Sequence, residues 1–106
     1  MTKYQLFIGL NDKDTKKQEI ETSAAFDLVS GIMFQTTGGA TITTGAGVYT
    51  HENGQKIIEK TIITTINDYD DSQAENIKKA AAAIKKALNQ ESILLTAQAL
   101  TACDLI

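Results

Sequence analysis

The sequence contains no arginine, tryptophan or proline, and it has a single cysteine and a single histidine. One cysteine excludes an intrachain disulfide, and one cysteine with one histidine excludes a zinc site built from these residues. The planar guanidinium group of arginine forms bidentate hydrogen bonds with phosphates and with the edges of guanine bases. Its absence, together with a net charge of -3, argues against direct nucleic-acid binding. An acidic surface is better suited to a basic protein partner or a metal ion.

Long apolar runs are also missing. No stretch approaches the roughly 20 apolar residues that span a bilayer, and the first residues lack the pattern of a signal peptide. We therefore expect a cytoplasmic protein without a membrane partner. With 42% apolar and 22% charged residues in a chain of 106, the composition is typical of one globular domain over residues 1–106.

Four segments have the character of β-strands, because apolar residues alternate in them or β-branched residues dominate. Glycines at positions 45 and 47 indicate an edge position or a bulge in the second segment. Asn53-Gly54 is a strong hairpin signal between the second and third segments. The predicted strands are Tyr4–Leu10, Ala40–Thr50, Gln55–Ile66 and Ser92–Cys103.

Two segments have helical periodicity. The first is predicted to begin near Ala24, with Thr22 or Ser23 as its N-cap, and to end at Gly38-Gly39. The second follows Ser72–Glu75, which has the pattern of a capping box. Its apolar stripe runs to Leu88, and Asn89 is a plausible C-cap.

The predicted order β-α-β-β-α-β favours an α+β fold of the ferredoxin-like, split β-α-β type. Such a fold has a four-stranded antiparallel sheet in the order 4-1-3-2 with two helices on one face. In this topology the connections between elements lie at the two opposite ends of the sheet, which we call the first rim and the second rim. The first rim contains 11–17, 51–55 and 89–91. The second rim contains 38–39 and 67–71.

The second face of this sheet would be left open, although three of its strands carry large apolar residues on both sides. An apolar open face requires a cover, and we predict a homodimer formed through it. The alternative is that exposed Ile and Leu residues are an ordinary part of the surface.

Charged residues gather on both rims. Carboxylates near a histidine can serve in acid–base chemistry or bind a partner, and acids before a helix can also simply complement its dipole. Asp12-x-Asp14 resembles the start of a calcium loop but lacks the required glycine. The candidate partner-binding residues are Asp12, Asp14, Glu52 and Glu91 on the first rim and Asp68, Asp70 and Asp71 on the second, and the candidate ligand or acid–base residues are Tyr49 and His51.

No phosphate loop, dinucleotide fingerprint or nucleophile motif is present. We therefore assign no catalytic residue, no metal ligand and no cofactor.

Three short stretches resemble a small bacterial and phage family without an assigned activity. They are an apolar first strand with a Gly-Leu step, a hairpin with an acidic, glycine-containing turn, and a Gln-Glu-Ser-Ile-Leu step before the last strand. The resemblance implies the ferredoxin-like fold and no catalytic residue. The stretches are Leu6–Leu10, Gly47–Glu59 and Gln90–Leu94.

Two functions follow as hypotheses. The first is a protein–protein interaction module, in one version a phage or mobile-element inhibitor of a host factor that acts through its acidic surface. The alternative is a small dimeric enzyme or ligand-binding protein of the α/β-barrel type, with its pocket where two sheets meet. A third possibility, a metal site at Asp12 and Asp14, remains open at this point.

Overall fold

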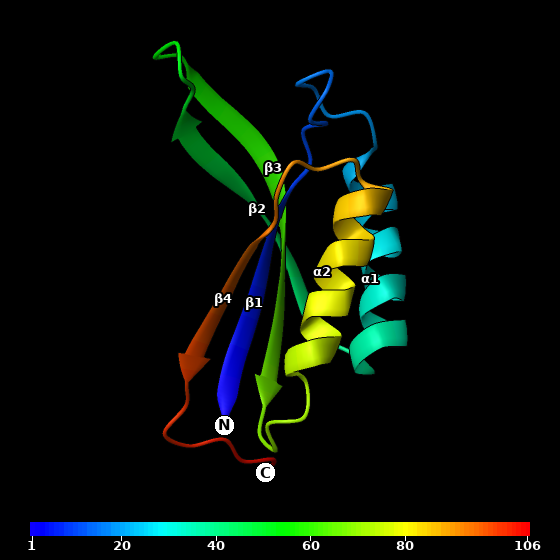
Figure 1. Ribbon diagram of the computed structural model, residues 1–106, viewed down its shortest axis with the longest axis vertical. Helices are drawn as coiled ribbons and strands as arrows, with labels where there is room; N and C mark the ends of the chain where they lie inside the picture. The colour runs from blue at the N-terminus through cyan, green and yellow to red at the C-terminus, as the bar shows by residue number, and fades with distance from the viewer.

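The computed structural model describes residues 1–106, and its elements follow the predicted order. The sheet is antiparallel throughout, in the order β2-β3-β1-β4, and both helices lie against one of its faces (Figure 1). The ferredoxin-like prediction, including the strand order 4-1-3-2, is confirmed. The elements are β1 (Thr2–Gly9), α1 (Thr22–Thr37), β2 (Thr41–Thr50), β3 (Lys56–Asp68), α2 (Ala74–Ala87) and β4 (Leu94–Ala99).

The core lies between the sheet and the two helices. The alternation of β1, which continues to Leu10 just beyond the strand, directs Leu6, Ile8 and Leu10 toward the helices, where each is at most 2% exposed. Each helix buries three residues spaced three or four apart, as an amphipathic helix should. The core residues outside β1 are Ala25, Val29, Met33, Ile62, Ile77, Ala80, Ile84 and Leu88.

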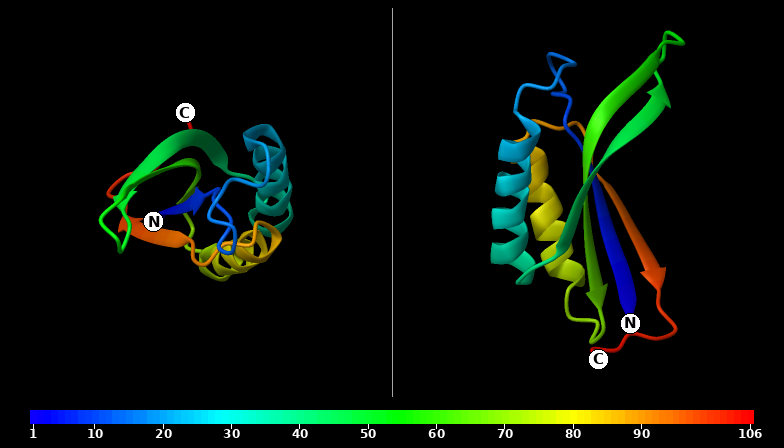
Figure 2. Two further views of the ribbon diagram at one scale, coloured as in Figure 1. Left: turned by 90° about the horizontal axis from the view of Figure 1, so that it is seen from above. Right: turned by 180° about the vertical axis from the view of Figure 1, so that it is seen from behind.

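The hairpin of β2 and β3 extends beyond the ends of the helices and projects from the body (Figures 1 and 2). Its strands stay in register up to the pair of Thr50 and Lys56, without the bulge that was one of the two alternatives for β2. The loop is closed by the N–H of His51, which donates to Gln55 O over 2.8 Å. Because no helix covers this part, the cross-strand pair Val48 and Ile58 is 62% and 61% exposed.

The start of α1 differs from the prediction. The helix begins at Thr22, its N-cap is Glu21, and no side chain caps it. The hydroxyl of Thr22 instead accepts a hydrogen bond from Gln18 Nε2 at 3.1 Å, so it is engaged with the preceding loop. The predicted end is confirmed, because Gly38 adopts a left-handed φ of 84° and its N–H donates to Phe34 O.

The capping box predicted for α2 is wrong. The helix begins at Ala74, and the hydroxyl of Ser72 donates to Asp70 Oδ1 rather than capping the helix. The carboxylate of Asp68, only 1% exposed, accepts the N–H groups of Ser72 at 3.1 Å and Gln73 at 3.0 Å. A buried acid at the end of β3 therefore holds the turn into α2.

The predicted last strand is too long. It begins at Leu94 and ends at Ala99, because Ala99 pairs with Thr2, the first residue of β1. Beyond that pair one more backbone bond joins the two segments, from the N–H of Leu100 to Met1 O at 3.0 Å. Strand β3 runs two residues further than predicted, since Asp68 also pairs with Thr2. All six residues of β4 are exposed.

Neither helix has the length and apolar character that crossing a membrane demands.

Candidate functional site

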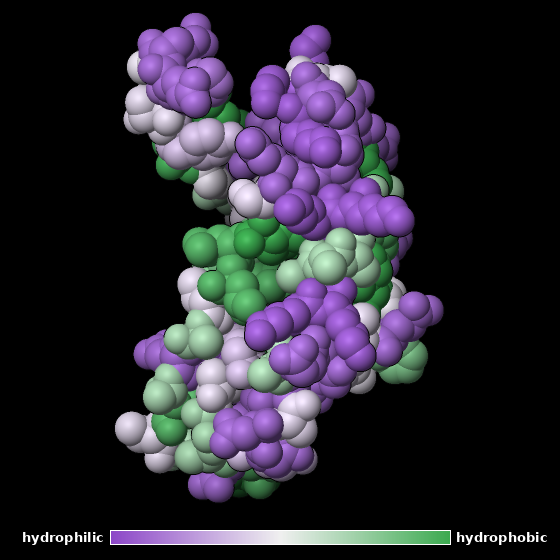
Figure 3. All heavy atoms as spheres, in the orientation of Figure 1, coloured by the Kyte–Doolittle hydropathy of each residue, from purple (hydrophilic) through white to green (hydrophobic).

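A cleft of about 510 Å³ lies at the first rim, between the projecting hairpin and the two nearby loops. Ten of its twelve lining residues are polar or charged. Figure 3 shows the hollow between two hydrophilic lobes, with an apolar area below it. Four of the sequence-predicted residues line the cleft: Asp12, Tyr49, His51 and Glu91. Asp14 and Glu52 lie on the same rim but do not line it.

Glu59 lies in this cleft and is only partly exposed. Its Oε2 accepts the N–H of Asn11 at 3.0 Å, so the carboxylate reaches across to the end of β1. Gly9 makes this possible. A Cβ at position 9 would stand 2.5 Å from Glu59 Cδ and 2.7 Å from Oε2, which is inside van der Waals contact. Any residue larger than glycine at position 9 would therefore force the Glu59 carboxylate to move.

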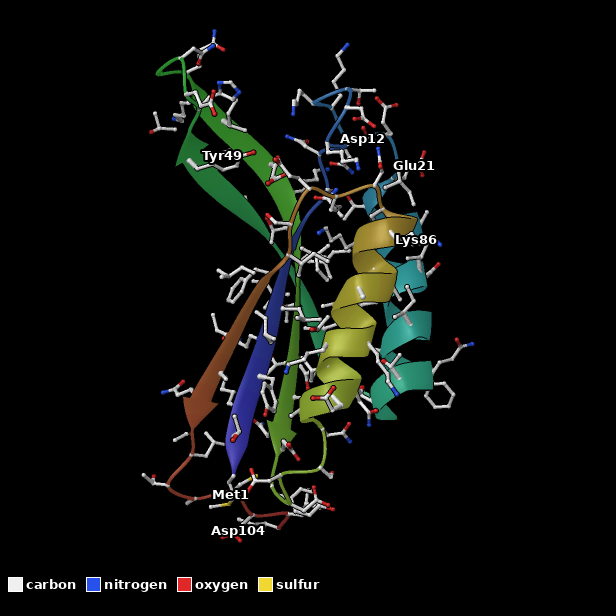
Figure 4. All side chains as sticks on the ribbon, viewed as in Figure 1. Met1, Asp12, Glu21, Tyr49, Lys86 and Asp104 are labelled. Atoms are coloured by element: carbon white, nitrogen blue, oxygen red, sulfur yellow. The ribbon has the colours of Figure 1, made fainter.

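Tyr49 faces Glu59 across the hairpin. Figure 4 shows its side chain pointing from β2 toward the space in front of the loop of Asp12. Partial burial, then the negative charge of Glu59, and then a hydrogen bond to the Glu59 carboxylate raise the pKa of Tyr49 above its ordinary value. The phenol beside the Glu59 carboxylate therefore keeps its proton to a higher pH than an ordinary tyrosine does.

Asp12 shapes the wall of the cleft rather than presenting free oxygens to it. Its Oδ1 accepts the N–H groups of Asp14 at 2.8 Å and Thr15 at 3.1 Å, and its Oδ2 accepts Asn89 Nδ2 at 2.9 Å. The bond from Asn89, followed by the two backbone bonds, holds the pKa of Asp12 below its ordinary value. Asn89 takes a left-handed φ of 50° just beyond the C-cap of α2, Leu88. This loop is thus fastened to the end of the helix.

The buried Gln90 completes this wall. Its Nε2 donates to Asn11 O at 2.9 Å and to Leu88 O at 3.3 Å, and it is 7% exposed. The turn after α2 is thereby tied to the end of β1, and Glu91 follows it at the mouth of the cleft.

His51 has only a weak local contact. Its Nδ1 accepts the N–H of Asn53 at 3.4 Å, and the side chain is exposed at the base of the hairpin loop. The structure thus brings Tyr49 to a carboxylate but gives His51 no acidic partner.

Carboxylates of the second rim have local partners. Asp68 is buried in the turn before α2, and Asp70 accepts the hydroxyl of Ser72 at 2.6 Å. This bond is the largest influence holding the pKa of Asp70 below its ordinary value. Asp71 lies 3.3 Å from the N-terminal amine of Met1. The three acids therefore reach solvent unequally, with Asp70 and Asp71 exposed and Asp68 enclosed.

Asp12 and Asp14 do not meet a third possible metal ligand, and no three His, Cys, Asp or Glu residues gather in a metal-binding arrangement. Both carboxylates instead accept Asn89 Nδ2 at 2.9 Å. The amide group of Asn89 thus joins the two carboxylates.

Opposite the helices, the sheet presents a short apolar row flanked by polar residues. Phe7 pairs with Ile63 on one side and with Leu94 on the other, and Leu94 is 61% exposed. The next open-face positions on β1 and β3, Gln5 and Thr65, are polar and hydrogen-bonded to each other at 3.1 Å. The open face is thus less apolar than the sequence suggested.

Glu59 was not among the residues predicted from the sequence. One signal was available: it is an isolated acid on the open-face side of a strand otherwise rich in Ile and Thr. An acid in that setting either points to solvent or has a partner. Glu59 has a partner because the register of β1 against β3 places Gly9, which has no side chain, next to the Glu59 carboxylate.

Fold and cleft together define a ferredoxin-like α+β protein with a polar cleft at one end of its sheet. The chain belongs to the family described as a protein of unknown function, DUF3574, whose model matches residues 3–103. No curated protein matches it.

Two solved structures of a phage SAM lyase, one in complex with S-methyl-5'-thioadenosine and one in the apo state, are 21% identical to this chain, with a TM-score of 0.64. They cover 92% of this chain and 79% and 78% of theirs. The divalent ion tolerance protein CutA1 from Ehrlichia chaffeensis is 13% identical, with a TM-score of 0.55, and the match covers 96% of this chain and 84% of that one. At these identities the likeness shows the fold.

Proposed function

We propose that this protein binds a small charged metabolite of the S-adenosylmethionine class in the cleft of the first rim. The observation that carries the proposal is a polar cleft lined by both Tyr49 and Glu59, in which a backbone N–H holds the Glu59 carboxylate in place. Polar groups that converge in a concave site are the usual mark of a ligand site. The ligand class follows the phage SAM lyase, whose fold this chain shares.

Isothermal calorimetry with S-adenosylmethionine and S-methyl-5'-thioadenosine tests this proposal. We expect saturable binding to the wild type and weaker binding to Glu59→Gln and Tyr49→Phe. Glu52→Gln is the matched control, because Glu52 is exposed in the same hairpin but outside the cleft. Equal binding by all four proteins would contradict the assignment of the site. Chromatography for released S-methyl-5'-thioadenosine shows in the same samples whether binding leads to cleavage.

We also propose, as a second function, a protein-binding module that acts through the acidic surface, in one version as a phage or mobile-element inhibitor of a host factor. Its support is that Asp14, Glu52, Asp70 and Asp71 are all exposed while the chain carries a net charge of -3. Binding to a defined basic partner should then weaken when Asp70 and Asp71 are changed to Asn. Unchanged binding by that variant would count against an acidic interface on the second rim.

A homodimer through the open sheet face remains part of this proposal. Leu94 offers the most exposed apolar side chain on that face. Light scattering over a concentration series should show a dimer that Leu94→Glu dissociates. Phe34→Glu is the matched control, since Phe34 is 70% exposed on α1, away from the sheet. A wild type that stays monomeric at all concentrations would refute the dimer.

A further inference from the structure

The cleft contains charges of both signs that do not neutralise one another. Lys13 and Lys16 line it from the loop after β1, and Glu59 and Glu91 line it from the sheet and the turn after α2. The two ion pairs of the molecule lie elsewhere, at Met1–Asp71 and Glu75–Lys78. Opposite charges that share a cleft without pairing are available to a ligand that carries both signs.

Glu59 is oriented for such a ligand. A carboxylate offers about four lone-pair positions, and the Asn11 N–H occupies one of them. The others are open to the cleft. Since the backbone N–H and the space above Gly9 fix the group in advance, little freedom is lost when a donor binds.

We infer that the cleft recognises a zwitterion, with Glu59, seated over Gly9, taking the positively charged group of the ligand and Lys13 and Lys16 taking its carboxylate. This inference rests on the proposed function for the location of the site, and it adds the polarity with which a ligand lies there. Gly9 is then a positioning residue, because it contacts no ligand and acts through Glu59.

Three probes separate the parts of the inference. S-adenosylmethionine carries a sulfonium and an amino-acid group, S-methyl-5'-thioadenosine carries neither, and S-methylmethionine carries both without the nucleoside. We expect calorimetry to show the wild type binding S-adenosylmethionine about 10- to 100-fold more tightly than S-methyl-5'-thioadenosine, as charge-assisted hydrogen bonds imply. Glu59→Gln should abolish that preference. The double variant Lys13→Gln, Lys16→Gln should reduce it.

Gly9→Ala tests the positioning role with the charge of Glu59 unchanged. The backbone of Gly9 is not left-handed, so alanine is accommodated and only the Glu59 side chain must move. We expect the variant to fold, to lose the preference for S-adenosylmethionine as Glu59→Gln does, and to titrate Tyr49 at a lower pH. Gly45→Ala is the matched control, since a Cβ there meets only Ile63 Cδ1 at 3.9 Å.

Each outcome decides between the proposals. Equal affinity of the wild type for the two nucleosides overturns the zwitterion while leaving the ligand class standing. Binding of S-methylmethionine alone overturns the S-adenosylmethionine class and supports the zwitterion. Absence of binding to all three probes overturns both. A Gly9→Ala variant that keeps the wild-type preference and the wild-type Tyr49 titration overturns the positioning role.

Discussion

Both rims of the sheet carry acidic residues, but these residues have different roles on the two rims. On the second rim, Asp68, Asp70 and Asp71 have a turn, a serine and the chain terminus as partners. On the first rim, Asp12 is likewise engaged by the chain, but Glu59 and Glu91 stand with two lysines around a cleft and form no ion pair. The number of acidic residues on a surface therefore does not show whether that surface is functional. What matters is whether a carboxylate also faces a cleft that contains unpaired cations.

The largest effect should come from Asp68. Asp68→Ala leaves the N–H groups of Ser72 and Gln73 without their buried acceptor, and we expect a loss of about 2–3 kcal/mol in the free energy of unfolding. Urea denaturation measures it. Asp70→Ala, two residues further on but exposed, should cost much less. Equal losses would remove the distinction between the enclosed acid and its exposed neighbour.

A smaller effect is expected at Asp12, where the folded-state pKa is lowered, first by Asn89. A lowered pKa contributes stability at pH values above the ordinary value for Asp, and this contribution is lost as the pH falls below about 4. Asp12→Asn should therefore flatten the decline of stability in acid. Asn89→Ala should flatten it in part, and the double variant should do no more than Asp12→Asn. Additive effects in denaturation at pH 2–6 would show that the two residues act separately.

A third prediction concerns the titration of Tyr49 in the cleft at alkaline pH. Because the pKa of Tyr49 is raised, its contribution to stability is complete below the ordinary tyrosine pKa and is lost as the pH rises above about 10. Glu59→Gln removes the charge and should let Tyr49 ionise at a lower pH, which ultraviolet absorbance against a Tyr49→Phe reference detects. Glu52→Gln should leave that titration unchanged. An unchanged Tyr49 titration in Glu59→Gln would show that the two side chains do not interact.

The smallest effect is expected at Asp71. Its contact with the N-terminal amine is at the surface, with the Asp71 side chain 66% exposed, and such pairs contribute between about 0 and 1 kcal/mol. Asp71→Asn should lower stability by an amount within this range, and the difference should shrink in high salt because exposed charges are screened. A loss as large as that of Asp68→Ala would mean that the N-terminus is a structural anchor.

Much of the fold could be predicted because its signals are local. The alternation in Tyr4–Leu10, the helix end at Gly38 and the hairpin at Asn53-Gly54 depend on residues close in the chain, and all three were confirmed. The errors arose where a distant group intervened. Asp68 replaced the capping box because the end of β3 passes beside the start of α2, and β4 is shorter than predicted because its pairing with β1 ends at Thr2 and Ala99.

The candidate site was only partly predictable for the same reason. Asp12, His51 and Glu91 were expected on one rim, since the strand order alone places their loops there, and Tyr49 was predicted as a ligand or acid–base candidate. Glu59 was not expected, because its position depends on the register of β1 against β3 and on the missing side chain of Gly9.

The sequence by itself determined the order of the elements, the absence of arginine and the absence of a Cys–His metal set, because periodicity and composition are properties of the chain. Only the tertiary structure decided which charges remain free. The fold sets the hydrogen-bond partners of each carboxylate and decides whether that carboxylate also lines a cleft. Those partners lie 48 residues away for Glu59 and 77 for Asp12.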